Sequence, residues 1–241
     1  MEINMRELGF NAGDVCVITG AGSGIGRATA KLAARSGLLV WGWDLSEESL
    51  ASLVKEITDS GGQAVSTVAD VTDEAAVKRA WDQADSIGAP RYLVNNAGPP
   101  QFTPLSYVDG LIQGPGSQAV VTEEWLSRHG EVAESVVMIA SIAAVIGVGN
   151  WYGPAKAAIA GYARSVAVRC GGKPRANSIG PGLTRTARTT HFDFAEAAAR
   201  NPMGRVGEPE DLANAIVFML SPAAGYINGT YLPVDGGALL R

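Results

Sequence analysis

The chain has 241 residues, of which 46% are hydrophobic and 18% are charged, as in a soluble globular protein. A formal net charge of -5 disfavours nucleic acid or an anionic membrane surface as a partner. No apolar run is long enough to span a bilayer, and the first ten residues lack the basic and apolar regions of a signal peptide. We therefore expect a cytoplasmic protein that does not act at a membrane.

Residue types that build disulfide frameworks and metal centres are scarce. The two cysteines, Cys16 and Cys170, form no CxxC pattern, and Cys16 lies inside an apolar run typical of a buried strand. The two histidines, His129 and His191, have no HExxH pattern or carboxylate cluster beside them. We expect neither a disulfide framework nor a bound metal.

Short β-branched runs alternate with amphipathic segments from one end of the chain to the other. The pattern predicts, in chain order, a strand at 15–19, a helix at 25–37, a strand at 38–44, a helix at 46–62 capped by Ser46, a strand at 64–70, a helix at 72–88, strands at 91–97 and 135–141, a helix at about 154–169, a strand at 175–182, a helix at 209–221 and a last strand near 230–237.

Continuous apolar strands separated by helices indicate a parallel sheet covered on both faces. Right-handed crossovers then predict a doubly wound α/β sheet, a three-layer αβα sandwich of the Rossmann type, with its ligand crevice at the carboxyl ends of the strands. No linker or internal repeat divides the chain. A single domain over 1–241 is predicted, with an N-terminal extension at 1–14 and a substrate-covering loop at about 183–202.

The stretch TGAGSGIG (19–26) leaves the first predicted strand and enters the first predicted helix. Its glycines lack Cβ atoms, so the backbone can turn sharply and approach a pyrophosphate. The helix that follows offers unpaired N–H groups and the positive end of its dipole. Because the loop has this strand-to-helix context, it predicts a dinucleotide site. The loop residues predicted to bind the cofactor are Gly20, Ser23, Gly24, Ile25 and Gly26.

Asp44 ends the second predicted strand, at the distance from the loop where an acid can accept hydrogen bonds from the adenosine ribose. Its neighbours are Trp43 and Leu45, so no Arg or Lys is beside it to pair with a 2′-phosphate. The sequence therefore favours NAD over NADP. The alternative is that Asp44 only caps the next helix. Trp41 and Trp43 share one strand face and are expected in the core.

Further motifs follow in a fixed order, and together they resemble the short-chain dehydrogenase/reductase family in its compact single-domain branch. The resemblance runs from Val15 to Gly237 and is carried by TGAGSGIG, Asp70-Val71, Asn95-Asn96-Ala97-Gly98, Ser141 with Tyr152 and Lys156, and Pro181-Gly182 with Thr184. It implies that Asp70 and Val71 hold the adenine. It also implies that Asn96, Ala97 and Gly98 line the cofactor site, and that Pro181, Gly182 and Thr184 lie beside the nicotinamide.

Tyr152 and Lys156 are four residues apart, so a helix would place them on the same face. Pro154 falls in the expected first turn, where a missing N–H costs little. A lysine cation and a positive nicotinamide would lower the pKa of the tyrosine from its usual value. Tyr152 is then the expected proton donor and acceptor in hydride transfer, Lys156 tunes it and binds the nicotinamide ribose, and Ser141 orients the substrate oxygen.

One departure from the family pattern lies between Asn96 and Asn150, where no asparagine supports the usual water-linked proton relay. Gln113 is nearest to the expected position. The glycines and the proline at 110–116 are expected to break or kink a helix there. The relay and the usual helix–helix dimer contact are therefore both in question.

The covering loop is expected to complete an apolar pocket for a secondary alcohol or ketone. The residues proposed to line this pocket are Pro99, Pro100, Trp151, His191, Phe192 and Phe194. The sequence thus predicts an NAD-dependent oxidoreductase of a small hydrophobic alcohol, assembled as a homo-oligomer, with a tetramer expected and a dimer possible. Two alternatives stay open. One is an NADPH-dependent 3-oxoacyl carrier-protein reductase, and the other is a non-catalytic dinucleotide sensor or scaffold.

Overall fold

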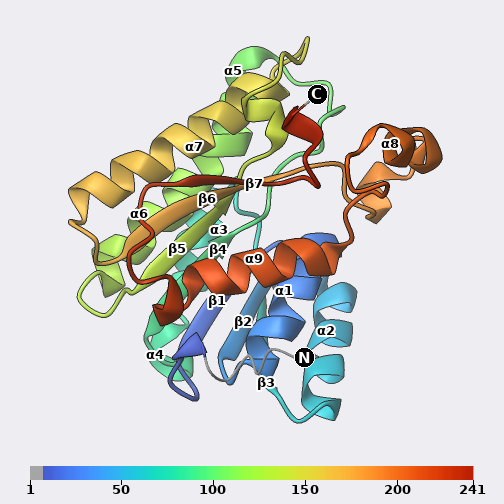
Figure 1. Cartoon of the computed structure of the whole chain (residues 1–241). Coiled ribbons are helices and arrows are strands. Elements are labelled where there is room, and N and C mark those ends of the chain that lie inside the picture. The colour runs from blue at the N-terminus through green and yellow to red at the C-terminus, as the bar shows by residue number, and fades with distance from the viewer. Residues whose placement is uncertain (1–7, 241) are drawn as a thin grey trace.

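A computed structural model describes residues 8–240 and contains one parallel sheet covered by helices on both faces (Figure 1). The strand order is β3-β2-β1-β4-β5-β6-β7, which confirms the predicted doubly wound α/β fold. Residues 1–7 of the expected N-terminal extension lie outside the described residues. The strands are β1 (Val15–Thr19), β2 (Leu39–Asp44), β3 (Gln63–Val68), β4 (Pro90–Asn95), β5 (Ser135–Ile139), β6 (Arg175–Pro181) and β7 (Tyr231–Val234).

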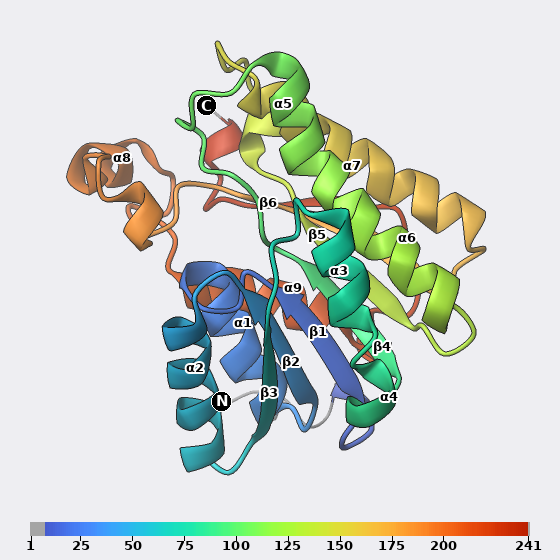
Figure 2. The ribbon, with the colours of Figure 1, turned by 180° about the vertical axis from the view of Figure 1, so that it is seen from behind.

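Two layers of helices bury the two faces of the sheet, as the opposite views in Figures 1 and 2 show. One layer consists of α1 (Gly24–Arg35), α2 (Glu47–Asp59) and α9 (Pro209–Leu220). The other consists of α3 (Glu74–Trp81), α6 (Ser117–His129) and α7 (Tyr152–Arg169). The short helices are α4 (Ala84–Ile87), α5 (Tyr107–Leu111), the π-helical η2 (Ile112–Gly116), α8 (Phe194–Arg200) and the 3-10 turns η3 (Ile142–Ala144), η4 (Ala187–Thr189), η5 (Pro222–Ala224) and η6 (Ala238–Leu240).

Tryptophans fill much of the core on the α3 side of the sheet. Trp41 and Trp43 are fully buried, as predicted, and both form edge-to-face contacts with Trp81 of α3, at centroid distances of 5.8 and 4.7 Å. These offset geometries are the ones that aromatic quadrupoles favour. Strand β2 is thereby held with its carboxyl end, Asp44, beside the glycine loop.

The strand order brings together two loops that are far apart in sequence. After β3 the chain returns to place β4 beside β1, so the glycine loop and the residues after β4 meet at the carboxyl edge of the sheet. Asn96 donates from Nδ2 to the carbonyl oxygens of Thr19 (3.0 Å) and Gly20 (3.1 Å). The Thr19 hydroxyl accepts from the backbone N–H groups of Asn96 and Ala97. These bonds hold the start of the glycine loop against the segment that follows β4.

Residues 110–116 were expected to break or kink a helix, and they do not break it but form an irregular turn. Helix α5 continues through one π-helical turn, η2, directly into α6. In an α-helix the Leu111 carbonyl would need the N–H of residue 115, which is a proline. The π turn instead pairs that carbonyl with the next residue, Gly116, so the missing donor leaves no gap in the hydrogen bonding.

Other boundaries differ from the predicted ones in small ways. The predicted helix at 72–88 is divided into α3 and α4, and α7 begins at Tyr152, two residues before the predicted start. Ser46 caps α2 as predicted, because its hydroxyl accepts from the Ser49 N–H at 3.2 Å. Within residues 8–240, none of the helices combines the length and the apolar character that crossing a bilayer would require.

Candidate active site

A cavity of about 910 Å³ lies at the carboxyl ends of the strands, under the segment that follows β6. It fits the size range of small-molecule sites in proteins. Most of the residues predicted to hold the cofactor or to act in catalysis converge on it, although they come from five separate parts of the chain. Those that line it are Gly20, Ser23, Gly24, Ile25, Asn96, Gly98, Ser141, Tyr152, Lys156, Pro181, Gly182 and Thr184.

Gly26, Asp44, Asp70, Val71 and Ala97 do not line this cavity. Asp44 nevertheless contacts the glycine loop, since its Oδ2 accepts a 2.9 Å hydrogen bond from the Gly22 N–H. Asp70 follows the neighbouring strand, and its Oδ1 accepts from the backbone N–H of Thr72 at 2.9 Å. The two carboxylates therefore lie just after β2 and β3, at the same edge of the sheet as the cavity.

The glycine loop has no room for side chains at Gly20 and Gly26. Gly20 has a φ of +67°, and a Cβ there would lie 2.7 Å from Nδ2 of Asn96. A Cβ on Gly26 would meet the same atom at 2.6 Å. Ser23 caps α1 without a side-chain hydrogen bond, so the first N–H groups of this helix remain available. This arrangement fits the diphosphate of a dinucleotide.

Ser141 lies just after β5, where its hydroxyl accepts a 3.2 Å hydrogen bond from the Ala143 N–H. Its backbone carbonyl accepts a 2.8 Å hydrogen bond from the hydroxyl of Tyr231 in β7. The Tyr231 ring crosses β6 at Gly180, where a Cβ would lie only 2.1 Å from the Tyr231 hydroxyl oxygen. The serine is therefore held through its main chain by a residue two strands away.

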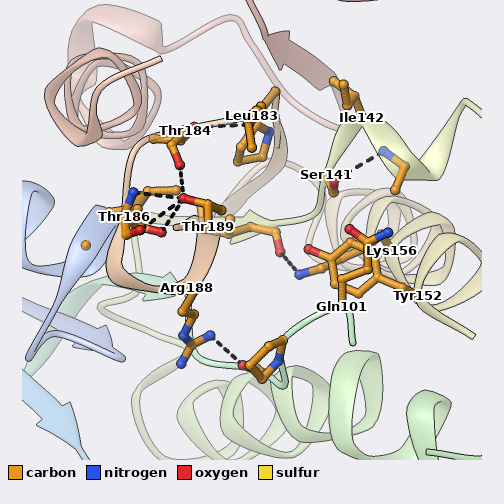
Figure 3. Close-up of a pocket in the computed structure, with 18 of the residues that line it drawn as sticks. Gln101, Ser141, Ile142, Tyr152, Lys156, Leu183, Thr184, Thr186, Arg188 and Thr189 are labelled. Carbon is orange, nitrogen blue, oxygen red and sulfur yellow. Dashed lines mark hydrogen bonds between the residues drawn. The ribbon is translucent and has the colours of Figure 1, made fainter. Parts of the chain in front are cut away.

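Tyr152 and Lys156 project into the cavity from the first turns of α7 (Figure 3). The start of the helix is fixed by Asn150, whose Oδ1 accepts a 3.0 Å hydrogen bond from the Tyr152 N–H. Lys156 donates from Nζ to the carbonyl oxygen of Ile139 at 3.0 Å, and Nζ lies 5.4 Å from the centroid of the Tyr152 ring. Pro154 lies in the first turn, as predicted.

The electrostatics of this pair differ from the expectation. Burial raises the pKa of Tyr152, and the opposing effects come from the Ser141 hydroxyl and from the cation of Arg188 rather than from Lys156. Burial, with a smaller effect from Arg188, lowers the pKa of Lys156 to about 8. Without a bound cofactor, Tyr152 therefore stays protonated at neutral pH, while Lys156 loses its proton in the mildly alkaline range.

The aromatic lining is partly as predicted. His191, Phe192, Pro99 and Pro100 line the cavity. Trp151 does not, because its indole N–H donates to the Thr103 carbonyl and its ring packs on Gly110, where a Cβ would lie 2.5 Å away. Phe194 does not either, because the covering segment turns into α8 there and the ring packs under the guanidinium of Arg185, at 4.3 Å.

The sequence reasoning missed three residues of the site. Phe102 lies beside His191 at a centroid distance of 5.0 Å and closes the cavity from the β4 side. Arg188 reaches across from the covering segment, and its Nη1 donates to the Gly98 carbonyl at 2.8 Å. Tyr231 supports Ser141. The Gly98-Pro99-Pro100 turn shortly before Phe102 was a weak sequence signal that this segment borders the site. No motif near Arg188 or Tyr231 indicated that either residue belongs to the site.

A glycine loop at the start of α1, an acid at the end of β2 and a Tyr–Lys pair on α7 define a dinucleotide-binding α/β protein of the oxidoreductase type. Comparison with known families agrees. Residues 14–113 match the short chain dehydrogenase model, and residues 116–238 match the model described as enoyl-(acyl carrier protein) reductase. The chain belongs to the short-chain dehydrogenase/reductase family.

Individual relatives cover nearly the whole chain. Cyclohexanol dehydrogenase of Acinetobacter sp. (strain SE19) is 34% identical, over 92% of this chain and 93% of its own length. Cis-4-hydroxycyclohexanecarboxylate dehydrogenase of Sinomonas cyclohexanicum is 35% identical, over 92% and 95%. 3-oxoacyl-[acyl-carrier-protein] reductase of Thermotoga maritima is 32% identical, over 95% and 98%.

Among solved structures, a protein of Beutenbergia cavernae described as an NAD(P)-dependent gluconate 5-dehydrogenase is 33% identical. The match has a TM-score of 0.88 and covers 97% of this chain and 99% of the other. That structure contains NADP. The family binds a nicotinamide dinucleotide, so the present chain is a nicotinamide-dependent oxidoreductase of the same fold.

Proposed function

We propose that this protein interconverts a secondary alcohol and a ketone with NAD(H), using Ser141, Tyr152 and Lys156. The observation that carries the proposal is their convergence: three polar side chains from β5 and α7 line one cavity together with the glycine loop. Tyr152 is the proton donor and acceptor, because its phenol is buried in the cavity beside the Ser141 hydroxyl. A family resemblance alone would not require that geometry.

The chain's own residues would hold the cofactor along the carboxyl edge of the sheet. The glycine loop and the start of α1 would take the diphosphate, and Asp44 would accept from the adenosine ribose. Asp70 and Val71 would border the adenine. At the other end, Asn96, Ala97 and Gly98 would border the nicotinamide ribose, while Pro181, Gly182 and Thr184 would lie against the nicotinamide itself.

NAD is the preferred cofactor in this proposal. A 2′-phosphate would lie beside the Asp44 carboxylate, which repels it. The nearest arginine of the loop region, Arg27, is already engaged, since its Nη2 bonds Glu56 at 2.8 Å and Ser52 at 3.0 Å. It also donates to two backbone carbonyls. A 2′-phosphate would therefore have to compete with Glu56 for this cation.

A nicotinamide held against Pro181, Gly182 and Thr184 would supply the hydride chemistry, as the acceptor in oxidation of the alcohol and as the donor in reduction of the ketone. The Ser141 hydroxyl holds the substrate oxygen, and the Tyr152 hydroxyl gives the proton to that oxygen in reduction or removes it in oxidation. Lys156 supplies a positive charge beside the phenol, held in place by the Ile139 carbonyl. The covering segment and Phe102 form the part of the cavity wall that faces the reacting groups from outside the sheet.

The substrate of this proposal is a ring-bearing secondary alcohol. The part of the cavity beyond Tyr152 is bordered by apolar groups, among them Ile142, Val148 and Phe192. Such walls favour an apolar ring over a polyol. The names of two relatives, which act on cyclohexanol and on cis-4-hydroxycyclohexanecarboxylate, support the same class.

A second candidate is a 3-oxoacyl carrier-protein reductase. It is favoured by the Thermotoga maritima relative and by the family description that residues 116–238 match. Acidic carrier proteins need a basic docking surface, and a net charge of -5 argues against one. Asp44 argues against the NADPH that this reaction would use.

The test is the loss of NADH absorbance over cyclohexanone, its 4-substituted derivatives, aromatic ketones and an acetoacetyl thioester, with NADPH in parallel. We expect turnover of cyclohexanones with NADH, reduced at least about 100-fold in Tyr152→Phe. Turnover of the thioester with NADPH alone would establish the second candidate. Dinucleotide binding without turnover of any of these substrates would contradict the proposed function and favour the sensor.

We also propose that the protein is a cytoplasmic homo-oligomer, with a tetramer as the expected form. Val168 on α7 and Phe218 on α9 are exposed apolar residues, which a second copy could cover. Light scattering at micromolar concentration tests the oligomeric state directly. A monomer mass would contradict it.

A further inference from the structure

Arg188 places a guanidinium in the wall of the cavity that also holds Tyr152 and Lys156 (Figure 3). Its hydrogen-bond partner there is a neutral group, the carbonyl oxygen of Gly98, at 2.8 Å from Nη1. Within residues 8–240, no acidic side chain forms an ion pair with it. By contrast Arg185, in the same segment, pairs with Glu208 at 3.1 Å.

The charges around the cavity are unbalanced. None of the described residues that line it is an aspartate or a glutamate, whereas Lys156 and Arg188 are both cations. The field of Arg188 reaches the reacting groups, since its charge lowers the pKa values of both Tyr152 and Lys156. A partly enclosed cavity with two cations and no anion attracts an anionic ligand.

We propose that Arg188 binds a carboxylate of the substrate, so that the alcohol is a hydroxy acid with an apolar ring between its hydroxyl and its acid. The inference rests on the proposed function, which places the reacting carbon at Tyr152. The planar guanidinium can hold a carboxylate with two parallel hydrogen bonds, and the carboxylate would replace the Gly98 carbonyl as the acceptor. A pair in which both partners are charged and two parallel bonds form is stronger than the single guanidinium–carbonyl bond it would replace.

The walls near Arg188 suit the ring of such an acid. Phe102 from the β4 side and His191 and Phe192 from the covering segment form one aromatic group, with centroid distances of 5.0, 6.0 and 4.3 Å. All three line the cavity together with Arg188. An apolar ring can pack on this group while the acid reaches the guanidinium.

The other anion that could reach this part of the site is the cofactor diphosphate. The diphosphate, however, belongs at the glycine loop, and the residue of the covering segment that approaches that loop is Thr186: a Cβ on Gly24 would lie 3.2 Å from Thr186 Cγ2. Arg188 points instead to Gly98, after β4. Arg188 is therefore away from the expected diphosphate and at the nicotinamide end of the site, where the substrate would also bind.

The kinetic test compares cis-4-hydroxycyclohexanecarboxylate with the neutral 4-hydroxycyclohexanecarboxamide, in wild type, Arg188→Gln and Arg185→Gln. We expect wild type to favour the acid, and Arg188→Gln to lose about 10- to 100-fold in kcat/KM for the acid, mainly through KM. Turnover of the amide should change less than about threefold. Arg185→Gln, the matched control from the same segment, should keep the preference for the acid.

A binding measurement separates this inference from the proposed function. Calorimetry with cyclohexanecarboxylate, which has no hydroxyl to oxidise, is performed on the protein loaded with NAD. Binding that is lost in Arg188→Gln and kept in Arg185→Gln supports the site even if no alcohol is turned over, a result that would refute only the proposed function.

Two results would overturn the inference. One is equal binding of cyclohexanecarboxylate, or none, in wild type and Arg188→Gln. The other is a loss in Arg188→Gln that is as large for NADH binding and amide turnover as for acid turnover, which would assign Arg188 to the cofactor.

Discussion

The hydroxyl of Tyr231 in β7 donates a 2.8 Å hydrogen bond to the backbone carbonyl of Ser141, across the intervening strand β6. The contact needs a glycine at position 180, because a Cβ there would overlap the tyrosine hydroxyl. Desolvation raises the pKa of Tyr231 to about 12, so the hydroxyl keeps its proton and remains a donor at working pH. Tyr231 is thus positioned to fix the serine that we propose orients the substrate oxygen.

Tyr231→Phe keeps the ring over Gly180 and removes only the hydrogen bond to Ser141. A neutral hydrogen bond contributes about 0.5–1.5 kcal/mol, so we expect kcat to fall by about 2- to 10-fold with little change in the midpoint of thermal unfolding. The loss should be absent when Ser141→Ala is also present, because the serine hydroxyl is then no longer there to be oriented. Equal losses in both backgrounds would show that Tyr231 acts independently of the Ser141 hydroxyl.

The pKa of Lys156 predicts the pH dependence of cofactor capture. Because kcat/KM for NADH reports on the free protein, it should be level below about pH 8 and fall above it as Lys156 loses its charge. Arg188→Gln removes a cation that disfavours the protonated lysine, so the midpoint should move to higher pH. A profile level to pH 9.5, or a shift to lower pH, would contradict this assignment.

Arg175 at the start of β6 stabilises the end of α9. Its two terminal nitrogens donate to the carbonyls of Met219, Leu220, Ser221 and Ile227, at 2.9 to 3.2 Å. Three of these carbonyls belong to the carboxyl end of the helix, which carries negative partial charge. Removing the guanidinium leaves buried acceptors without partners.

We therefore expect Arg175→Met to lower the free energy of unfolding by about 3–5 kcal/mol in urea denaturation. Arg175→Lys should recover part of this loss, since one ammonium group cannot reach all the carbonyls together. A loss below about 1 kcal/mol for Arg175→Met would mean that water satisfies the helix end as well as the arginine does.

Asp44→Asn tests the cofactor preference with the smallest change in structure. The amide oxygen can still accept from the Gly22 N–H, as the carboxylate does at 2.9 Å, while the charge is lost. We expect the ratio of kcat/KM for NADH to that for NADPH to fall by about 10- to 100-fold. Thermal unfolding controls for damage to the glycine loop. An unchanged ratio, with the loop intact, would mean that Asp44 is only structural.

Much of the fold follows from local pattern. The apolar runs of β1, β2, β4 and β5 were predicted within two residues of their ends, because a strand buried on both faces needs a continuous apolar sequence. Ser46 was predicted as the cap of α2 because capping depends on residues only three apart. A break or kink was predicted at 110–116, and the helix does not break there, because Pro115 rules out an ordinary α turn but not the wider π turn.

The candidate site likewise contains residues that local sequence spacing predicted and residues whose position depends on tertiary contacts. The glycine loop, Ser141, Tyr152 and Lys156 could be picked out from spacing, since their chemistry requires those residue types close to strand and helix ends. Trp151 and Phe194 were placed in the pocket wrongly. Whether an aromatic side chain faces a cavity or packs on Gly110 or Arg185 depends on contacts with distant segments.

The sequence by itself determined the strand and helix order, the dinucleotide loop and the Tyr–Lys spacing, because each is encoded within a few neighbouring residues. Only the tertiary structure decided that Arg188 reaches Gly98, that Tyr231 holds Ser141 over Gly180, and that burial sets the pKa values of Tyr152 and Lys156. These relationships join residues up to 90 positions apart. They arise from the strand order, which brings the ends of β4, β5, β6 and β7 to one edge of the sheet.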